Sequence, residues 1–136
     1  MSMFLFQDQR RFMGACGQTV AKYNEKQAIL YTQLLLEEAA ETREAALHLP
    51  LGNQRPTAEQ LAEIADGALD VVVVAIGLLY SLGLDPQPLW NEVQRSNVAK
   101  IDPATGQVKK REDGKVLKPD DWSPPDLRRI IAEQLK

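Results

Sequence analysis

Six acidic side chains stand at helical intervals in the most apolar part of this chain. They form two groups, which are Glu37, Glu38 and Glu41 in LLLEEAAE and Glu63, Asp66 and Asp70 in EIADGALDVVVVAIG. Residues three and four positions apart lie on the same face of a helix. Each group therefore predicts a compact acidic patch on one helix, and two such helices packed antiparallel would bring the patches together.

The second acidic group adjoins a run of valines, residues 71–74, which we expect to be largely buried. A carboxylate beside a core loses its hydration unless something pairs with it, and the sequence has too few basic residues nearby to do so. The candidate ligand atoms are all oxygens, which favours a hard divalent cation, Mg²⁺ above all. The first group has an alternative interpretation as a solvated helix face paired in part with Arg43.

Composition excludes several other classes of protein. One cysteine (Cys16) and one histidine (His48) cannot build a structural zinc site or a disulfide framework, and the lone cysteine fits a reducing compartment. The net charge of −3 argues against a dedicated nucleic-acid binder. Residues 71–79 are too few to span a bilayer, and the N-terminus lacks the order of a signal peptide. We therefore expect a cytoplasmic protein with neither nucleic acid nor membrane as partner.

Apolar periodicity predicts a mostly helical chain. The expected helices cover residues 6 or 8 to 20, 24–49, 57–83, 85–97 and 125–135. Residues 71–74 are β-branched and would also suit a strand, but the helical period on both sides favours a helix. We expect the third helix to bury Leu61, Ile64, Ala65, Ala68, Leu69, Val72, Val73 and Ile76.

Local signals set the ends of these helices. Asn24 with Gln27, and Thr57 with Gln60, have capping-box spacing. Gly83 suits a C-terminal cap, and Asp85 followed by Pro86 suits a helix start. Residues 102–125 are rich in proline, glycine and charge and predict an extended basic arm with a short hairpin at Asp113–Gly114.

The acidic motifs resemble the signature of the all-α nucleoside triphosphate pyrophosphohydrolases. Residues 37–41 (EEAAE), then 21 residues, then residues 63–66 (EIAD) match its Glu-Glu-x-x-Glu … Glu-x-x-Asp pattern. Residues 93–100 (VQRSNVAK) are similar to a Ser-Asn-x-x-Lys element, although Val98 and Ala99 depart from it. Residues 111–118 (REDGKVLK) and 122–127 (WSPPDL) are similar to the tail of a MazG-like subgroup of this superfamily.

This resemblance implies an all-α antiparallel bundle of four to five helices, completed by assembly into a homodimer or a dimer of dimers. Residues 1–136 would be one domain, with a helical core near 4–100 and an arm near 101–136. It also implies Mg²⁺-dependent hydrolysis of a nucleoside triphosphate at the α–β phosphate bond, with Mn²⁺ as a substitute metal.

The resemblance assigns roles by position. Glu38, Glu41, Glu63 and Asp66 would be metal ligands, and Glu37 would orient or deprotonate the attacking water. The resemblance gives Asp70 no role, and the residues alone leave three open: a metal ligand, a hydrogen-bond acceptor behind the ligands, or a partner for a basic residue. The substrate contacts would be Asn97, Lys100, Lys115 and Lys118.

Two alternatives to this function remain open at the level of sequence. One is hydrolysis of phosphoribosyl-ATP, and the other is a non-catalytic helical dimer that binds a metal or a nucleotide. Glu37 distinguishes the non-catalytic dimer from the two enzymes. A minimal metal site does not need this carboxylate, so a binding protein would tolerate its loss, whereas an enzyme would lose turnover.

Overall fold

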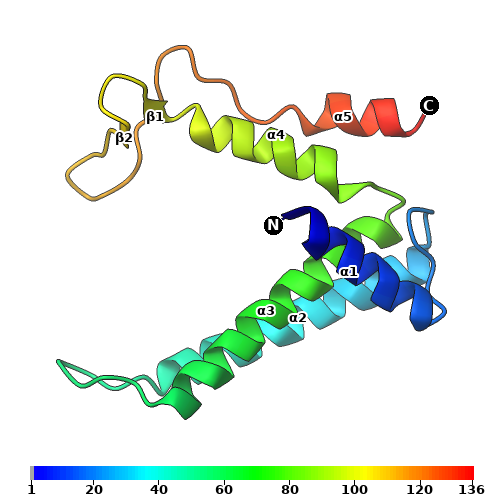
Figure 1. Ribbon diagram of the computed structural model, residues 1–136, viewed down its shortest axis with the longest axis horizontal. Coiled ribbons are helices and arrows are strands. Elements are labelled where there is room, and N and C mark those ends of the chain that lie inside the picture. The colour runs from blue at the N-terminus through cyan, green and yellow to red at the C-terminus, as the bar shows by residue number, and fades with distance from the viewer. Residues whose placement is uncertain (1) are drawn as a thin grey trace. The chain divides into compact units, whose positions relative to one another are not determined.

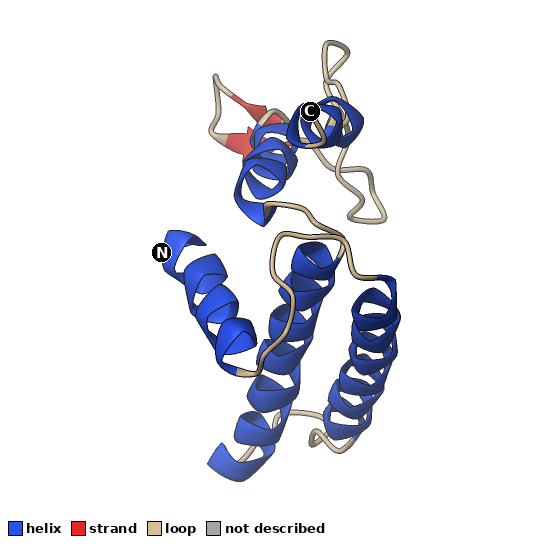
Figure 2. Cartoon of the chain, turned by 90° about the vertical axis from the view of Figure 1, so that its right-hand side faces the viewer, coloured by secondary structure: helices blue, strands red, loops and turns tan. Residues whose placement is uncertain are grey.

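The computed structural model of the protein describes residues 2–136, with side chains from Phe4 onward. The chain forms two compact units, one ending at Leu84 and the other beginning at Asp85. The first holds three helices, α1 (Ser2–Ala15), α2 (Glu25–Leu47) and α3 (Ala58–Ser81). The second holds α4 (Pro86–Val98), β1 (Ile101–Asp102), β2 (Gln107–Val108) and α5 (Leu127–Gln134). The predicted all-α class is confirmed, with one small antiparallel pair of strands added (Figures 1 and 2).

The helices α2 and α3 form an antiparallel hairpin, and it is the main packing contact of the first unit (Figure 1). Both predicted start signals operate. The Asn24 side chain accepts a hydrogen bond from the backbone N–H of Gln27, and Thr57 and Gln60 form a reciprocal capping box. Gly83 follows the last turn of α3 with a φ of +82°, which a residue with a Cβ rarely adopts.

The core of the first unit lies at the end of the hairpin where α2 begins and α3 ends. It joins two side chains of α1, one of α2 and three of α3, namely Phe6, Met13, Tyr31, Val74, Ile76 and Tyr80. The Tyr80 hydroxyl donates to the carbonyl oxygen of Phe6 at 3.2 Å, which ties α1 to α3. The valine run is helical, as predicted.

The prediction that one face of α3 is buried is wrong over much of the helix. Leu61, Leu69 and Val72 are 52%, 63% and 37% exposed, and only Ile76 of that predicted set is fully buried. The reason is the short reach of α1, whose core side chains pack with Val74, Ile76 and Tyr80 near the C-terminal end of α3. An apolar stripe of α3 is therefore left open along the rest of the helix.

The first helix also ends earlier than predicted, at Ala15 rather than near residue 20. Gly17 adopts a φ of +72°, and the N–H of Gln18 donates to the carbonyl of Met13 at 2.9 Å. This pattern is typical of a glycine-terminated helix. Within residues 2–136, no helix combines the length and the apolar character that crossing a membrane requires.

In the second unit, α4 begins as predicted, with the Asp85 carboxylate accepting from the N–H of Gln87 and Pro86 in the first turn. The hairpin at Asp113–Gly114 is confirmed by a bridge between Lys110 and Val116. The pair β1–β2 was not predicted. It surrounds a tight turn in which the Asp102 carboxylate accepts from the N–H of Ala104 at 2.9 Å.

An ion pair on α4 holds the start of α5 and the segment before it. Glu92, only 9% exposed, accepts from two guanidinium nitrogens of Arg95 at 2.9 and 3.0 Å and from the N–H of Asp126 at 3.0 Å. Arg95 also donates to the carbonyl of Pro124 at 3.1 Å. The Arg95 hydrogen bonds, followed by the Asp126 N–H, lower the pKa of Glu92 to about 2. Glu92 therefore stays ionised and keeps the arm on α4 across the neutral range.

Candidate active site

The two acidic groups lie on helices that meet at close range. Glu37, Glu38 and Glu41 are on α2, and Glu63, Asp66 and Asp70 are on α3. A Cβ added at Gly67 would lie 2.5 Å from the Thr42 hydroxyl oxygen and 3.2 Å from its Cα, so the helices touch there without room for a side chain. Thr42 follows Glu41, and Gly67 follows Asp66. The tight contact therefore falls at the acidic groups themselves.

Electrostatics shows that carboxylates of both helices act on one another. The pKa of Glu38 is raised, first by partial desolvation and then by the negative charges of Glu41, Asp70, Asp66 and Glu37. Glu63 is exposed and is not among the charges that act on Glu38. Within the described part of the chain, none of the six acidic residues has a basic partner within 4.0 Å. Such a group of like charges favours a cation between the helices.

The donor chemistry fits a hard divalent cation, because every candidate ligand is a carboxylate oxygen on one of two facing helices. The side chains are not gathered at ligand distance, however. Among the residues described, no group of three or more His, Cys, Asp or Glu side chains is placed to hold a metal ion. The metal-ligand roles of Glu38, Glu41, Glu63 and Asp66 stay predictions.

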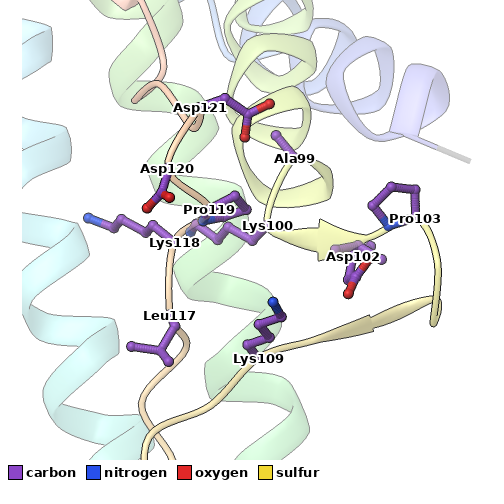
Figure 3. Close-up of a pocket in the computed structure, with 11 residues that line it drawn as sticks. Ala99, Lys100, Asp102, Pro103, Lys109, Leu117, Lys118, Pro119, Asp120 and Asp121 are labelled. Carbon is purple, nitrogen blue, oxygen red and sulfur yellow. The ribbon is translucent and has the colours of Figure 1, made fainter.

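The second unit contains a separate cavity of about 500 Å³ on the arm (Figure 3). It is lined by Ala99, Lys100, Ile101, Asp102, Pro103, Lys109, Leu117, Lys118, Pro119, Asp120 and Asp121. Two predicted substrate contacts, Lys100 and Lys118, are in this lining. The structure thus brings together two lysines that are 18 positions apart in the sequence.

The other two predicted substrate contacts lie elsewhere in the same unit. Asn97 is joined to the cavity through its side-chain oxygen, which accepts from the Lys100 ammonium group at 3.1 Å. Lys115 does not line the cavity. Its backbone N–H donates to the Asp113 carboxylate at 3.1 Å, within the hairpin turn. Asn97 and Lys100 therefore form one local group, and Lys115 stands apart from it.

The set of site residues predicted from the sequence leaves out two residues of this cavity region. One is Lys109, which lines the cavity. The other is Trp122, whose ring centroid lies 4.6 Å from the Lys118 nitrogen and 5.5 Å from the Lys100 nitrogen. Lys109 lies in an arm with no helical or strand period to distinguish it from Lys110. The sequence predicts that Trp122 either packs in the core or an interface or stacks on a base, and its place in WSPPDL does not reveal its contacts with lysines.

Comparison with known proteins gives one family. A family model described as phosphoribosyl-ATP pyrophosphohydrolase matches residues 10–97, which is well over half of the chain. The match contains all six acidic residues and Asn97, and it ends before Lys100 and the arm. No curated protein matches the chain.

Proposed function

Because this chain belongs to the phosphoribosyl-ATP pyrophosphohydrolase family, part of the MazG-like superfamily, it is a nucleotide pyrophosphohydrolase, and we propose that its substrate is a (deoxy)nucleoside triphosphate. Water would attack the α-phosphorus and release a nucleoside monophosphate and pyrophosphate. Family membership makes the protein a hydrolase of acid anhydrides, which removes the non-catalytic alternative.

The observation that carries this proposal is the unpaired acidic cluster between α2 and α3. Desolvation, and then the charges of four other carboxylates, raise the pKa of Glu38, and within the described residues no basic side chain lies within 4.0 Å of any of the six. We propose that Glu38, Glu41, Glu63 and Asp66 hold Mg²⁺, or Mn²⁺ in its place, with Asp70 behind them. A bound divalent ion would neutralise and orient the polyphosphate.

Within this cluster, Glu37 would do the proton chemistry. It lies on α2 next to Glu38, is exposed, and is surplus to four ligands. Its carboxylate would hold the attacking water by a hydrogen bond and accept a proton from it.

In the second unit, Asn97, Lys100, Lys115 and Lys118 would contact the nucleotide. The shared cavity of Lys100 and Lys118, and the Asn97–Lys100 hydrogen bond, support this for three of the four. The role of Lys115 rests on the resemblance alone.

Phosphoribosyl-ATP is the second candidate substrate, and the description of the matching family model favours it. The arm favours the first candidate, because residues 111–118 and 122–127 are similar to the tail of the MazG-like subgroup. Both substrates would be cut at the same bond by the same carboxylates.

The test is pyrophosphate release from a panel of ribo- and deoxyribonucleoside triphosphates together with phosphoribosyl-ATP, each with Mg²⁺, with Mn²⁺ and with EDTA. We expect metal-dependent release of pyrophosphate from at least one triphosphate and none in EDTA. Release of orthophosphate in place of pyrophosphate would contradict cleavage at the α–β bond. Turnover of phosphoribosyl-ATP alone would decide for the second substrate.

We further propose that the protein is a homo-oligomer, either a dimer or a dimer of dimers. The open stripe of α3 supports this, because Leu61, Ala65, Leu69 and Val72 are exposed and lie three to four residues apart on one helix face. An exposed apolar stripe of this kind is typical of a protein interface.

Light scattering at micromolar concentration should therefore give a mass of at least two chains. Leu69→Lys should shift the protein toward the monomer, because an ammonium group is costly in a dry interface. Leu51→Lys is the matched control, since Leu51 is 89% exposed in the loop between α2 and α3 and lies outside the stripe. A wild-type protein with the mass of one chain would contradict the proposal.

A further inference from the structure

The indole ring of Trp122 lies beside two ammonium groups. The Lys118 nitrogen is 4.6 Å from the ring centroid and the Lys100 nitrogen is 5.5 Å from it. Both distances lie within the range at which a cation is attracted to the ring. Trp122 itself is half-buried, and its ring N–H donates to the carbonyl oxygen of Ser96 at 2.7 Å. This hydrogen bond fixes the ring to α4. The ring contacts Lys100, just after α4, and Lys118, in the arm.

The cavity beside this ring holds a third ammonium group. Lys109 belongs to the lining together with Lys100 and Lys118, and the close-up shows its side chain extended into the region between β1 and residues 117–119 (Figure 3). Within residues 4–136, none of these three lysines has a carboxylate within 4.0 Å. Their charges are thus available to an anion.

Three carboxylates, from Asp102, Asp120 and Asp121, line the same cavity, so its formal charge is balanced. The Asp102 carboxylate keeps its charge but is held in the β1–β2 turn, where it accepts from the N–H of Ala104. What favours an anion is placement rather than net charge. The Lys100 and Lys118 nitrogens both lie within 5.5 Å of one ring centroid, and the negative face of the ring attracts each ammonium group.

We infer that Trp122 is a positioning residue, which holds Lys100 and Lys118 for a polyphosphate chain in this cavity, and that Lys109 is a third phosphate contact. We take this polyphosphate to be that of the nucleotide substrate, and this part of the inference rests on the proposed function. A polyphosphate chain carries several charged oxygens in a row, which suits several separate cations. The cavity volume of about 500 Å³ is within the usual range for small-molecule sites.

Binding of inorganic tripolyphosphate to the full chain, measured by calorimetry without divalent cations, tests the inference. Trp122→Leu should weaken binding roughly tenfold, and Trp122→Phe, which keeps a ring but loses the N–H, should weaken it by about threefold. Lys109→Met should cost about tenfold. Lys110→Met is the matched control, since this neighbouring lysine does not line the cavity, and it should change binding by less than about twofold.

A loss of binding in Trp122→Leu would also arise if the arm merely came loose from α4. The variant Lys100→Met/Lys118→Met separates these cases. If Trp122 acts through the two lysines, adding Trp122→Leu to that variant should change affinity by less than about twofold, because the residues are coupled. A loosened arm would also displace Lys109 and reduce affinity further, which would overturn the positioning role.

The failure of this inference is distinct from failure of the proposed function. Wild-type protein that binds tripolyphosphate with the expected losses, but releases no pyrophosphate from any nucleotide, would support the cavity and contradict the proposed substrate. Active protein whose tripolyphosphate affinity is unchanged by Trp122→Leu and Lys109→Met would overturn the inference and leave the function standing.

Discussion

Glu37→Gln should lower kcat for pyrophosphate release by about 10²- to 10⁴-fold, the range expected for loss of a general base. Glutamine keeps the length and shape of the side chain but cannot accept a proton from water. Glu37 lies on the helix that carries Glu38 and Glu41, and it is one of the charges that raise the pKa of Glu38. Removing that charge should leave Mg²⁺ binding within a few-fold of the wild-type affinity, as measured by calorimetry.

The control for this variant is Glu44→Gln, seven residues further along the same helix. Glu44 is exposed and pairs with His48 at 3.5 Å near the end of α2, so its loss should change neither kcat nor metal affinity appreciably. Full turnover in Glu37→Gln would remove Glu37 from the proton transfer. Joint loss of turnover and of Mg²⁺ binding would make Glu37 a metal ligand instead.

The helices of this protein were predictable because their signals are local. Asn24, Thr57 and Asp85 each cap a helix through a hydrogen bond to a residue two or three positions away. The arm's hairpin at Asp113–Gly114 is equally local, since Gly114 supplies a φ of +84°. Such contacts depend on short stretches of sequence, which contain the whole of the determining chemistry.

Burial was less predictable, because it depends on which elements cover a face. The period of Leu61, Ile64, Leu69 and Val72 correctly predicts an apolar side of α3, but α1 reaches only the C-terminal part of that helix. The sequence alone therefore could not tell a face covered within the chain from one left open. The proposal that a second copy covers the open stripe starts from this difference between predicted and observed burial.

The candidate site likewise combines local features, which the sequence predicts, with tertiary contacts, which it does not. The acidic spacing indicated two patches, but the tight contact at Thr42 and Gly67 that brings their helices together is a matter of tertiary packing. The contacts of the arm join residues that are far apart in the sequence. Trp122 bonds to Ser96 and Asp126 bonds to Glu92 over 26 and 34 positions, with no periodic pattern between the partners.

Gly77→Ala should destabilise the first unit by about 1–3 kcal/mol or more, as overpacking of a well-packed core does. A Cβ at Gly77 would lie 2.6 Å from Cζ and 2.7 Å from Cδ1 of Tyr31, and still closer to its Cε1. Tyr31 has little freedom to retreat, because it is 4% exposed and its hydroxyl donates to the Gln18 side chain at 2.6 Å. The measurement is urea unfolding followed by circular dichroism.

The size of this clash can be isolated with two further variants. Gly14→Ala places the same methyl group in a helix where nothing lies within 4 Å, so it should stabilise by about 0.5–1 kcal/mol through helix propensity alone. Tyr31→Leu removes the ring that Gly77 makes room for, and adding Gly77→Ala to it should cost much less than in the wild-type background. Equal costs in both backgrounds would mean that Gly77 is needed for a reason other than the Tyr31 ring. The close approach of α2 and α3, on which the facing acidic groups depend, would then rest on the Thr42–Gly67 contact rather than on this one.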